Sequence, residues 1–89
     1  MEKIREMREI VKKELEHIPR GVKGSPQNEL RAIYWIVRMN SLGKRPRFRT
    51  REECLQYAIK RIRKNYPNFV PIYDSSFFKM KINNNLDEE

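Results

Sequence analysis

The sequence has few of the residues that hold small proteins together through covalent bonds or metal ions. Cys54 is its one cysteine and His17 its one histidine, among 89 residues. An internal disulfide is therefore excluded, and a cysteine–histidine metal site lacks its ligands. We expect a protein of the reducing cytoplasm without metal or cofactor, in which Cys54 is a buried small apolar side chain and His17 supports the end of a helix.

The sequence also lacks a long hydrophobic run and a convincing catalytic pair of carboxylates. No stretch approaches about 20 consecutive apolar residues, the length of a membrane-spanning helix. Glu52 and Glu53 are adjacent, but they fall at a predicted helix start rather than in a site that could hold a metal. A chain of this length has room for one modest core and hardly for a buried active-site cavity as well. We therefore expect one domain over residues 1–82 that is not an enzyme, followed by a frayed acidic tail over residues 83–89.

Positive charge is abundant, and it is concentrated in one segment. Of the 20 lysines and arginines, nine fall within residues 44–64, where Glu52 and Glu53 oppose them, so this segment carries +7 of the net charge of +8. So dense a cationic block is costly in self-repulsion unless it faces a polyanion, most commonly a nucleic acid backbone. We expect contact with DNA or another nucleic acid. The alternatives are ion pairs with the glutamate-rich N-terminal helix and docking on an acidic protein.

The candidate nucleic-acid-binding residues lie in the basic loop and on the helix that follows it. Lysine and arginine bind phosphates through charge and counterion release, and an aromatic ring among cations can stack on an exposed base. Phe48 has a second interpretation, as a plug that fixes the loop to the core. The complete candidate set is Lys44, Arg45, Arg47, Phe48, Arg49, Arg51, Tyr57, Lys60, Arg61, Arg63 and Lys64.

Apolar periodicity and capping residues predict two helices in the first half of the chain. Apolar residues recur at steps of three and four over about residues 2–17, which indicates one stripe of an amphipathic helix. Ser25 is a good N-cap and Pro26 suits the first helical position. The second helix is predicted to continue to about Ser41 and to stop at Gly43.

A third helix is predicted after the basic loop. Thr50 and Glu53 form a capping box, which starts this helix at Arg51, and the chain leaves it near Asn65. The predicted fold is therefore mainly α, a small three-helix domain with a C-terminal extension. The residues predicted to face the core from the third helix are Cys54, Leu55, Ala58, Ile59 and Ile62.

The C-terminal extension has two interpretations. Phe78, Met80 and Ile82 alternate with lysines, which predicts a strand and, with the residues before it, a short β-hairpin over residues 69–82. The competing interpretation is a helix capped by Asp74, because Phe78 and Ile82 are also four residues apart. A hairpin would make a winged helix possible, but the proline-containing connection before the third helix is long for that fold.

The second helix is apolar on two sides, so its second face needs cover. One face carries Leu30, Ile33, Tyr34 and Val37, and a second face roughly opposite carries Ala32, Trp35, Ile36 and Met39. In one interpretation the helix is central and is sandwiched by its neighbours. In the other, Trp35, Ile36 and Met39 remain partly exposed as the docking site for a partner protein.

The basic runs give the chain a resemblance to a known class of protein. With its run of arginines over Arg45–Glu53, its second basic run over Lys60–Lys64 and its small size, the chain resembles a small accessory subunit of the archaeal B-family DNA polymerase holoenzyme. The resemblance implies a non-catalytic role, namely docking on the polymerase and stabilising it or its grip on DNA. The alternative is a free-standing DNA-binding protein of the winged-helix or helix-turn-helix type that regulates transcription.

Overall fold

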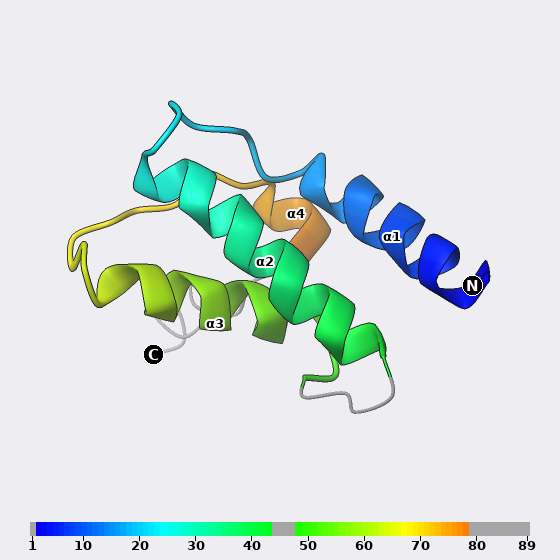
Figure 1. Cartoon of the computed structure of the whole chain (residues 1–89). Helices are drawn as coiled ribbons and strands as arrows, with labels where there is room; N and C mark the ends of the chain where they lie inside the picture. Colours follow the sequence, from blue (N-terminus) through cyan, green and yellow to red (C-terminus); the bar gives the residue numbers. More distant parts are fainter. Residues whose placement is uncertain (1, 44–47, 79–89) are drawn as a thin grey trace.

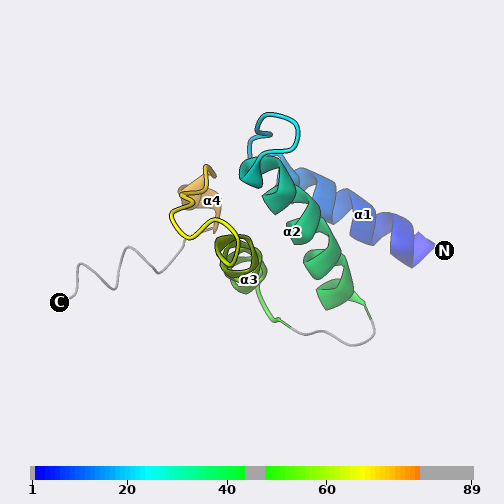
Figure 2. The same ribbon diagram turned by 60° about the vertical axis from the view of Figure 1, so that its left-hand side comes forward.

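The computed structural model describes residues 2–43 and 48–78. Within these ranges the chain forms four helices, α1 (Glu2–Leu15), α2 (Pro26–Leu42), α3 (Arg51–Arg63) and the single turn α4 (Ser75–Phe78) (Figure 1). The longest of them, α2, packs against α1 and against α3, which lie on different sides of it (Figures 1 and 2). The predicted mainly α fold is confirmed, and so is the central position of the second helix.

The ends of α2 follow the sequence signals. Ser25 is the N-cap, and its Oγ accepts a hydrogen bond of 3.2 Å from the Asn28 N–H. Pro26 occupies the first turn, where its missing N–H costs nothing. At the other end the Gly43 N–H donates to the Asn40 carbonyl at 3.1 Å, which closes the last turn. These local capping preferences determine where α2 begins and ends, independently of how the helix packs.

The core lies where α2 meets its neighbours. Leu30, Tyr34 and Val37 of the predicted α2 face are buried, and so is Cys54, as the sequence predicted. Burying a large apolar side chain stabilises the fold by about 1.5 to 3 kcal/mol. The buried hydrophobic residues of the described chain are Val11, Ile18, Leu30, Tyr34, Val37, Cys54, Leu55, Ala58, Ile59, Ile62 and Phe78.

A buried carboxylate joins α1 to α2. Glu14 is 5% exposed, and it accepts hydrogen bonds from the Tyr34 hydroxyl and from both Nε and Nη2 of Arg38, the latter two at 2.9 and 3.1 Å. Burial, and then the hydrogen bond to Glu14, raise the pKa of Tyr34 above its usual range, so the hydroxyl stays a donor. Arginine and carboxylate meet here as a bidentate pair, the strongest geometry for such a bond.

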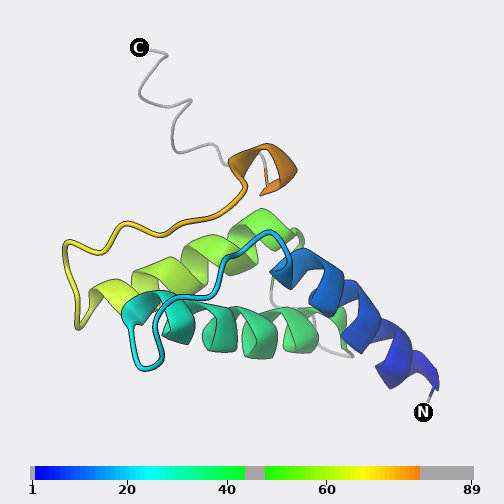
Figure 3. The ribbon, with the colours of Figure 1, turned by 90° about the horizontal axis from the view of Figure 1, so that it is seen from above.

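A single side chain ties two distant loops to the start of α2. Gln27 is buried, and its Nε2 donates to the carbonyls of Pro19 and Ile72, each at 3.0 Å. Its Oε1 accepts from the Ile72 N–H at 2.9 Å. The extended segment 69–73 thereby runs back over the molecule beside the loop after α1 (Figure 3). Gly21 lies against this site, because a Cβ there would come within 2.6 Å of the Gln27 Cβ.

The C-terminal extension turns into a helix where the described chain ends. Asp74 Oδ1 accepts from the N–H and the hydroxyl of Ser76, as a helix cap does, so the helical alternative describes α4. No strand forms in the described part of residues 69–82, and residues 79–82 lie outside it. Burial explains the choice, because α4 places the Phe78 ring in the core, edge-on to Tyr34 at 5.9 Å.

His17 connects the end of α1 to this extension. Its Nδ1 lies 3.0 Å from Asp74 Oδ2, and its carbonyl accepts from the Asp74 N–H at 2.8 Å. Its ring stacks on Phe77 with centroids 3.7 Å apart and planes 4° from parallel. The residue was predicted to support the end of a helix, and it does lie just after α1, but its side chain bonds to the C-terminal segment.

Candidate nucleic-acid interface

The third helix begins with the predicted capping box. The Thr50 Oγ1 accepts from the Glu53 N–H at 3.2 Å, and the Glu53 Oε1 reaches back to the Arg49 N–H at 2.7 Å. The carboxylate therefore binds one residue earlier than the usual partner, the N-cap amide. Acidic residues in the first turn and basic residues in the last turn also match the helix dipole. The position of this helix start sets the orientation of α3 about its own axis. That orientation determines which cations of the helix face outward.

The outward face of α3 carries a cationic stripe, defined as Lys60, Arg61 and Lys64. All three residues are exposed, and they lie within one turn of each other at the C-terminal end of the helix. Tyr57 is one turn earlier, and its hydroxyl accepts from Arg61 Nη1 at 3.4 Å. The Arg61 guanidinium lies 5.9 Å from the centre of the Tyr57 ring, within reach of a cation–π interaction. An aromatic ring therefore lies beside the cationic stripe.

Phe48 packs beside this stripe. It is partly buried, lies against the core cluster and has its ring 5.3 Å from that of Tyr57, tilted by 38°. This position agrees with the interpretation of Phe48 as a plug for the basic loop. The Phe48 ring also contacts the Tyr57 ring, which in turn bonds to Arg61 of the stripe.

Two of the candidate arginines are bonded to the C-terminal segment instead. Arg51 Nη2 donates to the Phe77 carbonyl at 3.0 Å, and its guanidinium lies 3.9 Å from the centre of the Phe77 ring. His17 stacks on the same ring, so the two groups must occupy its opposite faces. Arg63 Nε donates to the Phe69 carbonyl at 3.0 Å. Both arginines were predicted to belong to the interface, because the sequence alone does not reveal the carbonyl groups to which they bond.

The remaining candidates divide between described and undescribed residues. Arg49 is exposed just before α3. Lys44, Arg45 and Arg47 lie outside the described residues. The structure therefore brings Tyr57 together with the cationic stripe, whereas Arg49 lies at the other end of α3.

The cationic stripe has no carboxylate partner in the described structure. Over residues 2–43 and 48–78, the salt bridges are Arg38 with Glu14 and His17 with Asp74. The alternative that the glutamates of α1 neutralise the basic cluster is therefore not realised for the stripe. Its charge faces solvent.

The predicted partner-binding face of α2 is partly covered. Ile36 is 59% exposed, whereas Trp35 and Met39 are partly buried and pack against the core cluster. Trp35 and Met39 therefore contribute to the fold and still present part of their surface. Ile36 is the fully outward member of this set.

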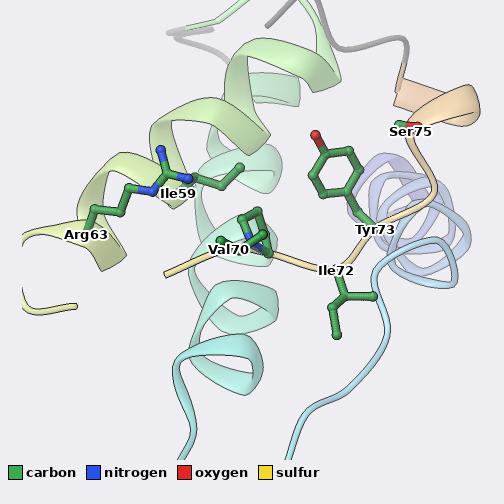
Figure 4. Close-up of a pocket in the computed structure, with 7 residues that line it drawn as sticks. Ile59, Arg63, Val70, Ile72, Tyr73 and Ser75 are labelled. Atoms are coloured by element: carbon green, nitrogen blue, oxygen red, sulfur yellow. The ribbon is translucent and has the colours of Figure 1, made fainter. Parts of the chain in front are cut away.

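A shallow pocket lies on another side of α3. It has a volume of about 450 Å³ and opens between Ile59 and Arg63 of α3 and the segment Val70–Tyr73, with Ser75 at its edge (Figure 4).

In the described residues no group of three histidine, cysteine or acidic side chains could hold a metal ion. In the same residues no helix is long and apolar enough to cross a membrane.

Comparisons with protein-family models, with curated proteins and with solved structures give no match to this chain. Function is therefore inferred from the residues themselves.

Proposed function

We propose that this protein is a non-catalytic accessory subunit of a DNA-processing complex, such as a DNA polymerase holoenzyme, and that it binds nucleic acid through the cationic stripe of α3. The observation that carries the proposal is the exposure of Lys60, Arg61 and Lys64 on one helix face without carboxylate partners among the described residues. Such a face attracts phosphates through charge and counterion release and has no evident role in the fold.

An accessory role is favoured over a free-standing winged-helix regulator. A wing requires residues 69–82 as a hairpin that projects beside the third helix. Residues 69–78 are extended and then helical, and they are held by Gln27, Arg51 and the buried Phe78. The partly exposed Trp35 and Ile36 on α2 add a surface that a protein partner could cover.

A salt titration tests the nucleic-acid part of the proposal. Fluorescence anisotropy of a labelled DNA oligonucleotide would be measured with the full-length chain over a series of salt concentrations. Each phosphate contact contributes about 0.7 to 0.9 to the slope of log affinity against log salt. We expect the triple substitution of Lys60, Arg61 and Lys64 by glutamine to flatten this slope by about 2 to 3 on the same scale, whatever the base sequence of the probe.

A matched control separates local contact from net charge. Lys12 and Lys13 are exposed neighbours in the last turn of α1, and replacing both by glutamine also removes positive charge. This control should leave the slope nearly unchanged. The assignment of the interface to α3 would be refuted if the affinity of the wild-type chain for DNA did not change with salt concentration. It would also be refuted if the two variants lowered the salt slope equally.

A further inference from the structure

One end of the molecule gathers segments that are far apart in the sequence. Gln27 bonds both to Pro19 in the loop after α1 and to Ile72 in the segment after α3. Figures 1 and 3 both place that loop, the start of α2, the C-terminal end of α3 and the following segment at this same end. We call it the basic-apolar end and define it by Arg20, Val22, Lys23, Arg63, Val70 and Ile72.

Exposed aliphatic side chains concentrate there. Val22 is 78% exposed, Val70 77% and Ile72 61%. A single exposed aliphatic residue is ordinary on a protein surface, but here three occur at one end. Val70 and Ile72 are also among the residues that line the pocket, with the Ile72 side chain pointing to the side of the segment away from Ile59 (Figure 4). A concave, mainly apolar lining of this kind suits the insertion of a bulky aliphatic side chain.

The charge of this end is mainly positive. The chain contains no aspartate or glutamate from residue 17 to 28 or from residue 54 to 73. Arg20, Lys23 and Arg63 are exposed, and the bond from Arg63 Nε to the Phe69 carbonyl fixes its guanidinium at the pocket. Of the acidic residues that follow in sequence, Asp74 is bonded to His17 and Ser76. Glu29, in the first turn of α2, is an exposed carboxylate at this end, against the three exposed cations Arg20, Lys23 and Arg63. The surface is thus complementary to an acidic ligand.

We propose that the basic-apolar end docks a segment of another protein that carries both carboxylates and bulky aliphatic side chains. The pocket lining has one aromatic ring, Tyr73, and three aliphatic side chains, Ile59, Val70 and Ile72. Because bases stack on aromatic rings and not on valine or isoleucine, this composition favours a protein segment over a nucleic acid. The pocket distinguishes it from a lipid surface, because a concave site with a held arginine fits a single side chain flanked by carboxylates. The site differs from the predicted docking face on α2, and it does not depend on nucleic-acid binding by the stripe.

The test uses a defined probe, a fluorescein-labelled peptide of 12 residues in which glutamate and leucine alternate. Anisotropy is measured with the full-length chain, and we expect Ile72→Ser to weaken binding by about tenfold, a change equivalent to about 1.4 kcal/mol. Ile36→Ser is the matched control, because Ile36 is an isoleucine of similar exposure, 59%, that lies on α2 and is not part of the basic-apolar end. It should leave the affinity unchanged.

Two variant peptides separate the two parts of the recognition. Replacing every glutamate of the probe by lysine should abolish binding, and replacing every leucine by serine should weaken it about as much as Ile72→Ser does. The triple glutamine variant of the cationic stripe should still bind the original peptide, so a failure here is distinguishable from a failure of the proposed nucleic-acid function.

Several outcomes would overturn the proposal. These are a wild-type chain that does not bind the peptide, an affinity that Ile36→Ser reduces and Ile72→Ser does not, and equal binding of the serine-substituted peptide. Cosedimentation with vesicles of an anionic lipid that is lost in Ile72→Ser, without binding of the peptide, would assign this end to a membrane surface instead. Displacement of the peptide from the wild type by an oligonucleotide at equimolar concentration would assign it to nucleic acid.

Discussion

The interface between α1 and α2 and the outward face of α3 use their cations in opposite ways. In the first, Arg38 is paired with the buried Glu14, which also accepts a hydrogen bond from Tyr34, so the charge of Arg38 is neutralised within the fold. In the second, the cationic stripe has no carboxylate partner in the described structure and faces solvent. The comparison divides the basic residues into those that the fold requires and those that remain for a ligand.

The largest effect is expected from removal of the buried carboxylate. Glu14→Ala leaves Arg38 without its counter-charge and Tyr34 without its acceptor, in a site where the side chains of the pair are 6% and 12% exposed. Breaking a buried pair in this way costs about 3 to 5 kcal/mol. Urea denaturation of the full-length chain would measure the loss of unfolding free energy.

The double substitution Glu14→Leu with Arg38→Met is the control for that experiment. It removes both charges and fills the space with apolar atoms, so the part of the loss that comes from the unpaired charge should return. The Tyr34 hydroxyl still lacks its acceptor, which leaves a cost of about 1 to 3 kcal/mol. If Glu14→Ala left the free energy of unfolding unchanged, Arg38 would not be a cation that the fold requires, and the division between structural and available cations would be contradicted.

A smaller loss is expected for Trp35→Ala. Trp35 is partly buried and packs against the core cluster, so the change should cost about 2 kcal/mol, less than the 3 to 5 kcal/mol of a fully buried large aromatic side chain. Thermal and urea denaturation measure it, with Ile36→Ser as the exposed neighbour that should cost little. A loss at the full core value would make Trp35 a core residue and remove it from the predicted partner-binding face.

The link between His17 and Asp74 should produce a modest dependence of stability on pH. Hydrogen bonds from Ser76, then from His17, lower the pKa of Asp74 from its ordinary value of 3.8. Because the folded pKa is below the unfolded one, this stabilisation is present above pH 3.8 and is lost as the pH falls through the lowered pKa. The stability difference between the wild type and Asp74→Asn should therefore be present at neutral pH and vanish in acid.

Urea denaturation at several pH values compares these two proteins. Asn retains the shape and much of the capping ability of Asp, so the comparison isolates the charge. A difference that stayed constant from neutral pH to below the lowered pKa would contradict the assigned role of the carboxylate.

The smallest effect on stability is expected where the effect on nucleic-acid binding is largest. The triple glutamine variant of the cationic stripe should unfold within about 0.5 kcal/mol of the wild type, as exposed substitutions usually do. Arg51→Gln is the contrast within the same helix, because it removes the bond to the Phe77 carbonyl and should destabilise the protein measurably. A triple variant that unfolded easily would show that the stripe belongs to the fold.

The sequence predicted the helices well because their limits depend on local chemistry. Pro26 after a serine N-cap and the pair of Thr50 with Glu53 specify helix starts within a few residues, and the apolar period then identifies the buried face. The predicted core residues of α3 are all buried for the same reason. These predictions required no knowledge of which helix packs on which.

The parts that the sequence could not predict depend on partners distant along the chain. Glu14 and Gln27 look like surface polar residues, and their burial follows from the groups that satisfy them in other elements. Arg51 looked like a phosphate ligand until the Phe77 carbonyl was placed beside it. The choice between hairpin and helix after Asp74 was decided by a core position for Phe78, which a pattern of alternating residues cannot reveal.

The side-chain amide of Gln27 makes the pair of hydrogen bonds that a neighbouring β-strand would otherwise make. By donating to the Ile72 carbonyl and accepting from the Ile72 N–H, it reproduces the paired bonds of a β-ladder in a segment that belongs to no sheet. The Ile72 amide proton should consequently exchange with solvent slowly, although its residue is exposed and outside any helix. The same side chain also holds Pro19, so the loop after α1 and the segment after α3 should open as one cooperative unit in hydrogen exchange.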